Sequence, residues 1–169
     1  MKGKTVLFFA GIALSLACME GFSATYASGK DLQLYSWGDG LRKVKQVEGS
    51  RLVLLDETRQ DMGIRLRYKY NYAGYPCTLV FFFSNNDKLY STSLVFQNSV
   101  ANSAEYEAMI KKLSGMLRRD FGRPSAEKGG TSQALDWTFK KTEISLSYYK
   151  IDSNGYLNLA SIDYSELKK

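Results

Sequence analysis

The sequence predicts an α+β domain, in which an antiparallel meander sheet of about seven strands carries two helices packed on one face. Strand-like segments with alternating side chains are separated by connections of only a few residues, which antiparallel neighbours require. Two other segments carry an apolar stripe at helical spacing and must bury it against the sheet. The expected order is one helix, four strands, a second helix and three strands, so that a helix-then-meander unit appears twice. The 169 residues are 44% hydrophobic, as one folded domain requires.

The first residues predict export. Lys2 and Lys4 precede the apolar run 6–17 (VLFFAGIALSLA), and small residues follow in "SATYAS". The apolar run is shorter than the roughly 20 residues that a spanning helix needs, so we expect a cleaved signal peptide and no membrane span. Cleavage is expected after Ala27, and the product is periplasmic or secreted. The predicted division is a signal peptide, 1–27, and a single α+β domain, 28–169.

Cys18 leaves a second processing route open. "SLAC" is similar to a bacterial lipobox, which implies a lipid anchor on Cys18. Ser15 and Leu16 depart from that pattern, since leucine and a small residue are usual there. In either case Cys77 is the only other cysteine and no intramolecular disulfide forms. Cys77 lies in the apolar run "PCTLVFFF", which predicts a buried, inert thiol.

The stretch "YSWGDGLRKVKQVEG" predicts the entrance to the first helix. Asp39 is expected to cap a helix that starts near Leu41, because its carboxylate can accept a first-turn N–H. Gly49 is a natural stop, Gly38 permits a tight turn, and Trp37 is expected to pack under the helix entrance. The alternative interpretation is a loop that holds a ligand.

Four strands are predicted between the helices. The clearest is "MGIRLRYKYNY", in which apolar and aromatic side chains alternate with Gly63, Arg65, Arg67, Lys69 and Asn71. "AGYP" and "SNND" are turn sequences. The predicted strands are 51–57, 62–72, 77–83 and 88–96.

The second helix carries the stronger signals. Asn102 or Ser103 can cap it, with Glu105 as the capping-box partner, and Gly122 and Pro124 end it. "SAEKGGTSQ" is expected to be a flexible link, and "DSNG" a turn before the last strand. Its apolar stripe consists of Tyr106, Met109, Ile110, Leu113, Leu117 and Phe121. The last predicted strands are 134–140, 143–151 and 156–164.

Three sequence segments carry a family resemblance. "SWGDGLRKV…EG" opens the first helix, "MLRRDFGRP" ends the second helix, and the tryptophan strand "LDWTF" follows. In this arrangement the chain resembles the β-lactamase-inhibitor-protein-like group, which includes small outer-membrane-assembly lipoproteins. The resemblance covers most of the mature chain, but its motifs only mark where helices and strands begin and end. It implies a binding or assembly module and carries over no catalytic residue.

Catalysis has few candidate residues. The chain contains no histidine, and the acidic cluster Asp56, Glu57 and Asp61 is typical of a solvated hairpin turn. "DSNG" lacks the later acidic ligand of a calcium loop, and no zinc, phosphate-loop or dinucleotide pattern is present. We therefore predict that the protein is not an enzyme and has no metal and no cofactor. Nucleic acid is not an expected partner, because alternation places the cations and aromatics of "RLRYKYNY" on opposite faces.

The sheet face away from the helices is the predicted partner-binding surface. A hairpin of strands 51–57 and 62–68, joined by four residues, would place Leu52 and Leu54 beside Arg67 and Arg65 on that face. Lys69 extends the cationic row. The sequence thus predicts an exported, non-enzymatic module of the bacterial cell envelope that docks an acidic envelope protein or an anionic glycolipid there. The alternative is that the chain's own N-terminal lead or linker covers this face.

A second functional hypothesis concerns three tyrosines. Tyr68, Tyr70 and Tyr72 share the opposite face of the same strand, where they could line a concave pocket for a small molecule or a glycan. An open cleft would leave them partly exposed, whereas a packed helix would bury them.

Overall fold

The computed structural model of the protein describes residues 35–97, 100–130, 132–149 and 159–167. The predicted signal peptide, Cys18 and the "DSNG" turn lie outside these ranges. The elements follow the order α1 (Leu41–Glu48), β1 (Val53–Gln60), β2 (Gly63–Tyr72), β3 (Tyr75–Phe83), β4 (Leu89–Gln97), α2 (Ser103–Phe121), β5 (Ala126–Lys128), β6 (Ser132–Phe139), β7 (Thr142–Tyr149) and β8 (Leu159–Glu166).

The described strands form one antiparallel sheet in the order β1-β2-β3-β4-β8-β7-β6-β5. The α+β class, the antiparallel sheet and the presence of two helices are confirmed. The described residues contain eight strands, one more than the approximately seven that were expected. The additional strand is β5, in the segment that the sequence predicted to be a flexible link. It pairs with β6 at the edge of the sheet although its three residues carry no alternating pattern.

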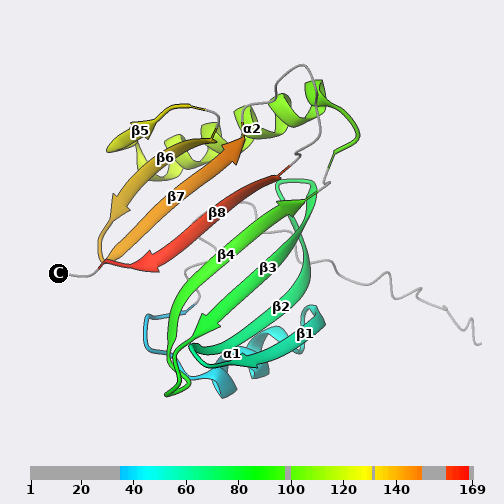
Figure 1. Cartoon of the computed structure of the whole chain (residues 1–169), viewed down its shortest axis with the longest axis vertical. Coiled ribbons are helices and arrows are strands. Elements are labelled where there is room, and N and C mark those ends of the chain that lie inside the picture. The colour runs from blue at the N-terminus through cyan, green and yellow to red at the C-terminus, as the bar shows by residue number, and fades with distance from the viewer. Residues whose placement is uncertain (1–34, 98–99, 131, 150–158, 168–169) are drawn as a thin grey trace, which may run out of the picture.

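With β5 included, the two halves of the chain have the same topology. Each half of the chain is one helix followed by a four-stranded meander, and the two meanders meet where β4 pairs with β8. Figure 1 shows the halves one above the other, with α1 beside β1 and β2 and α2 beside β5, β6 and β7. We call them the N-terminal half (α1 and β1–β4) and the C-terminal half (α2 and β5–β8).

A single hydrophobic core joins the helices to the sheet. The stripe of α2 is buried at Tyr106, Met109, Ile110, Leu113 and Leu117, as its spacing predicts, and Phe121 is partly buried. Each fully buried side chain of this size contributes about 1.5–3 kcal/mol. The sheet residues of the core lie on one side of each strand: Ile64, Leu66, Tyr68, Leu79, Phe81, Leu94, Phe96, Ile144, Leu146, Ile162, Tyr164, Leu135 and Trp137.

The two helices begin differently. Asn102 caps α2, because its side chain accepts a hydrogen bond from the Glu105 N–H at 3.0 Å, as predicted. Asp39 does not cap α1, and that expectation was wrong: the N-cap is Gly40 and has no side-chain bond. The Asp39 carboxylate instead accepts from the Ser36 N–H at 2.9 Å and from the Lys43 ammonium at 2.7 Å. It closes the turn before the helix.

The register of the first hairpin corrects the predicted face of two leucines. Gln60 pairs with Gly63, so the connection has two residues rather than four, and Leu54 pairs with Tyr68 on the core side. A bulge follows between Leu54 and Asp56. Leu52 also packs against the core. Neither leucine lies beside Arg65 and Arg67, because the bulge changes the register by one residue and so moves the preceding side chains to the other face.

Gly63 allows β2 to begin in close contact with the end of β3. Its φ is +133°, and a Cβ atom there would lie 1.9 Å from the Phe83 carbonyl oxygen. Only glycine therefore fits where β2 begins against β3, and the strand starts one residue after Met62.

Candidate functional site

Strand alternation places a cationic row on the outer face of the sheet, the face opposite the core. Arg65, Arg67 and Lys69 follow one another on β2 and lie opposite Phe82, Val80 and Thr78 of β3. Their neighbours in β2, Ile64, Leu66 and Tyr68, are buried on the other side. The register thus confirms that the three predicted cations share one face. We define the cationic row as these three residues.

One member of the row already has an acidic partner. Arg67 Nη1 lies 2.9 Å from Asp56 Oδ2, and Asp56 pairs with Arg67 in the β1–β2 register. Both side chains are partly exposed, so the pair contributes up to about 1 kcal/mol. Arg65 and Lys69 form no ion pair with any described residue, and the Arg65 Nε atom is buried without a hydrogen bond. Two cations of the row thus remain unneutralised in this part of the chain.

Apolar side chains surround the row on the N-terminal half. Val53, which pairs with Lys69, is 66% exposed, and Tyr90 is 44% exposed. The rings of Tyr90 and Phe82 are 6.4 Å apart, and Phe82 pairs with Arg65. The outer face of the N-terminal half is therefore both cationic and apolar.

The outer face of the C-terminal half carries a serine–aspartate network instead. Asp163 accepts hydrogen bonds from the hydroxyls of Ser93 and Ser161, the second at 2.7 Å. Asp136 accepts a hydrogen bond from the Ser145 hydroxyl at 2.7 Å and forms an ion pair with Lys128 at 3.0 Å. Burial alone would raise the pKa of the Asp136 carboxyl, but the bonds from Ser145 and Lys128 lower it below its usual value. These carboxylates are satisfied by their neighbours.

The sequence patterns did not predict this network. Its signal is a serine at alternate positions of neighbouring strands, in "SLSYY" and "LASIDYSE". Because the strand pairings that align these serines with Asp136 and Asp163 are long-range, alternation alone does not reveal the contacts.

The three tyrosines of the alternative hypothesis do not line an open cleft in the described part of the chain. Tyr68, Tyr70 and Tyr72 are all buried in the core. The Tyr68 ring packs edge-on against Phe81 with centroids 6.0 Å apart, and Tyr72 packs against Phe96 at 6.4 Å. Burial raises the pKa of the Tyr68 hydroxyl, with Glu48 and Glu57 adding to the shift. These side chains belong to the core and do not line an open pocket.

Cys77 is a buried, free thiol, as its apolar surroundings predict. Burial raises its pKa to about 12, although a hydrogen bond with the Tyr72 backbone opposes the shift. A thiol in this state has almost no thiolate at neutral pH and is a poor nucleophile.

Among the described residues, no group of three or more His, Cys, Asp or Glu side chains is arranged to hold a metal ion. No helix in the same ranges is long and apolar enough to cross a membrane. The chain matches no known family model, and no curated protein or solved structure shows significant similarity to it.

Proposed function

We propose that this protein is an exported, non-enzymatic binding or assembly module of the bacterial cell envelope. Both helices cover one face of the sheet, and the outer face of the N-terminal half docks an acidic segment of another envelope protein. The observation that carries the proposal is the pair of unneutralised cations, Arg65 and Lys69, beside exposed apolar side chains. Long-range charge complementarity would guide such a partner and fix its orientation.

The apolar residues favour a protein over a lipid headgroup as the partner. Aromatic side chains are enriched in the centre of protein interfaces, and on this face Phe82 pairs with Arg65 and its ring lies near that of Tyr90. Val53 adds a further exposed apolar group next to Lys69. A patch of this composition contributes apolar contact area as well as charge, which polyanion binding alone does not need.

The test is affinity capture from the native envelope with a tagged form of the mature protein. The variant Arg65→Glu/Lys69→Glu should capture the partner at least about tenfold less efficiently, because each reversal turns an attraction into a repulsion. Added salt should mimic this effect on the wild type, since ions screen exposed charges over about 10 Å at 0.1 M. Arg67 is left unchanged because it pairs with Asp56.

The matched control is Lys111→Glu/Arg123→Glu, which changes the net charge equally at exposed positions on α2 and just after it. If both double variants lose the partner alike, net charge rather than this face governs capture. Retention of every partner by Arg65→Glu/Lys69→Glu at low salt would refute the proposed surface. Binding to vesicles of anionic lipid, without any captured protein, would instead identify a glycolipid-like partner.

A further inference from the structure

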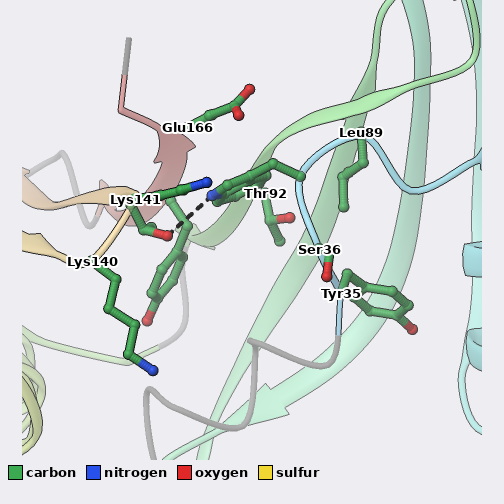
Figure 2. A pocket seen from close by; sticks show the side chains of 10 residues that line it. Tyr35, Ser36, Leu89, Thr92, Lys140, Lys141 and Glu166 are labelled. Atoms are coloured by element: carbon green, nitrogen blue, oxygen red, sulfur yellow. Dashed lines mark hydrogen bonds between the residues drawn. The ribbon is translucent and has the colours of Figure 1, made fainter. Parts of the chain in front are cut away.

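A cavity of about 480 Å³ lies where the chain's opening segment meets the turn between β6 and β7, away from the outer face. Figure 2 shows Lys140, Lys141 and Glu166 on one side of it, Tyr35, Ser36 and Leu89 on the other, and Thr92 between them. Its volume falls in the range of pockets that bind small molecules. The remaining lining residues are Trp37, Thr142 and Tyr164.

Long-range contacts hold the cavity walls in place. Trp37 Nε1 donates a hydrogen bond to Thr142 Oγ1 at 3.1 Å, so the tryptophan reaches the first residue of β7 and not only the helix entrance that the sequence predicted. The Tyr35 hydroxyl donates to the buried Glu48 carboxylate at 2.6 Å, and its ring packs edge-on against Phe81. Two aromatic walls are therefore fixed before any ligand arrives, which lowers the entropic cost of binding.

The cavity also contains a hydroxyl group without a partner. Thr92 is only 4% exposed, it lines the cavity, and its side chain makes no hydrogen bond within the part of the chain that the structure describes. Its hydroxyl oxygen is not one of the buried side-chain atoms that lack a hydrogen bond, so it faces the open space of the cavity. A bound molecule, or water that a ligand replaces, can therefore form a hydrogen bond with this hydroxyl.

Two lysines give the cavity its charge preference. Lys140 and Lys141 form the turn between β6 and β7, and neither makes an ion pair with a described residue. Lys140 has a φ of +56°, a conformation that asparagine or glycine adopts more readily than lysine. Glu166 is the one acidic side chain among the lining residues, so the positive groups outnumber it.

We propose that this cavity binds a small organic anion that carries a planar ring. The ring would lie among Tyr35, Trp37 and Tyr164, and the anionic group would be bound by Lys140 and Lys141, with the Thr92 hydroxyl as a further hydrogen-bonding group. The proposal is independent of the outer face, because none of these residues belongs to the cationic row or its neighbours.

The probes are two fluorescent dyes that differ in one charge. 8-Anilinonaphthalene-1-sulfonate is an organic anion with a planar naphthalene ring, and N-phenyl-1-naphthylamine is its uncharged analogue. The mature protein should bind the anion more tightly. Lys140→Asn/Lys141→Gln keeps residues suited to the turn, and it should weaken binding of the anion by about tenfold, since charge-assisted bonds are stronger than neutral ones. Binding of the uncharged dye should change by less than about twofold, because it forms no such bond.

Three further variants locate the dye. Lys111→Gln/Arg123→Gln, which removes two charges elsewhere, should leave both affinities unchanged. Glu166→Gln should tighten binding of the anion, because it removes an opposing charge. Trp37→Phe should lower the energy transfer from tryptophan to the bound dye, because Trp37 lines the cavity and Trp137 does not.

Thr92→Val distinguishes a ligand site from a structural residue. The substitution keeps the shape of the side chain and removes a hydroxyl that has no partner among the described residues. The thermal midpoint should therefore stay constant or rise, while affinity for the anion falls. A lower thermal midpoint with unchanged affinity would show a structural role and contradict the proposal. Equal affinity of Lys140→Asn/Lys141→Gln and its control for the anion, or no dye binding by the folded wild type, would also overturn it.

Discussion

The N-terminal and C-terminal halves of this protein have the same topology but expose different chemistry on the outer face. In the N-terminal half, Arg65 and Lys69 have no ion pair among the described residues and lie beside exposed apolar side chains. In the C-terminal half, Asp136 and Asp163 are bonded to neighbouring hydroxyls and to Lys128. Because satisfied groups gain little from a partner, the partner surface that we propose lies on the N-terminal half.

The halves also differ in how their helices contribute to the core. The eight-residue α1 buries Val44 and Glu48, whereas the 19-residue α2 buries five residues of its stripe. The strand β2 compensates in the N-terminal half with the three buried tyrosines 68, 70 and 72. A short helix is sufficient where a strand supplies large aromatic side chains.

The largest expected effect is on the labelling of Cys77 by a thiol reagent. Together with the fluorescence of Trp137, this labelling shows whether the two halves unfold together, because Cys77 lies in the N-terminal half and Trp137 in the C-terminal half. A pKa raised from 9.0 to about 12 lowers the thiolate fraction at neutral pH roughly a thousandfold, and burial slows labelling further. Labelling of Cys77 should therefore need denaturation. In Trp37→Phe, labelling and Trp137 fluorescence should change at the same denaturant concentration. Labelling at a lower concentration would show that the N-terminal half opens alone.

The raised pKa of Cys77 also predicts a pH effect. The folded state holds the thiol proton more tightly than the unfolded state, so this contribution to stability is complete below about pH 9 and is lost as pH rises toward about 12. Cys77→Ala should flatten that part of the stability curve, measured by denaturant unfolding at several pH values. An identical alkaline slope in wild type and variant would exclude the thiol as its source.

Core truncations compare the two helices. Leu113→Ala should cost about 2–5 kcal/mol, as for a buried leucine. Val44→Ala removes fewer carbon atoms, at about 0.8 kcal/mol for each buried CH₂, and should cost about 1–3 kcal/mol. Both values come from urea unfolding. A larger loss for Val44→Ala would reverse the comparison and make α1 the more important helix.

A smaller effect concerns the contact between the halves. Trp37→Phe removes the hydrogen bond from Trp37 Nε1 to Thr142 Oγ1 and should cost about 0.5–1.5 kcal/mol. The same change in a Thr142→Val background should cost less, because the acceptor is already absent. Additive losses in this double-mutant cycle would show that the bond does not couple the halves.

The smallest expected effect concerns Asp56. Asp56→Asn removes the charge that pairs with Arg67 and should change the free energy of unfolding by less than about 1 kcal/mol, since both side chains are partly exposed. It also frees the third cation of the row, so capture of an acidic partner should improve at low salt. Weaker capture by a folded Asp56→Asn variant would mean that the partner does not recognise positive charge.

Local sequence patterns determined several parts of this protein. The cap at Asn102 and the stripe of α2 arise from residues three and four apart, and the alternation of β2 places Arg65, Arg67 and Lys69 on one face. The apolar run around Cys77 also sufficed to predict its burial. These features depend only on near neighbours along the chain.

Tertiary structure decided the rest. The register that places Leu52 and Leu54 on the core side of β1 depends on the bulge between Leu54 and Asp56, although Leu54 remains 43% exposed. β5 exists because β6 offers it an edge, and the three tyrosines are buried because the core covers them. The cavity depends on Trp37 reaching Thr142, 105 residues away. Contacts between residues so far apart leave no periodic pattern in the sequence, because periodicity records only which face of its own element a residue occupies.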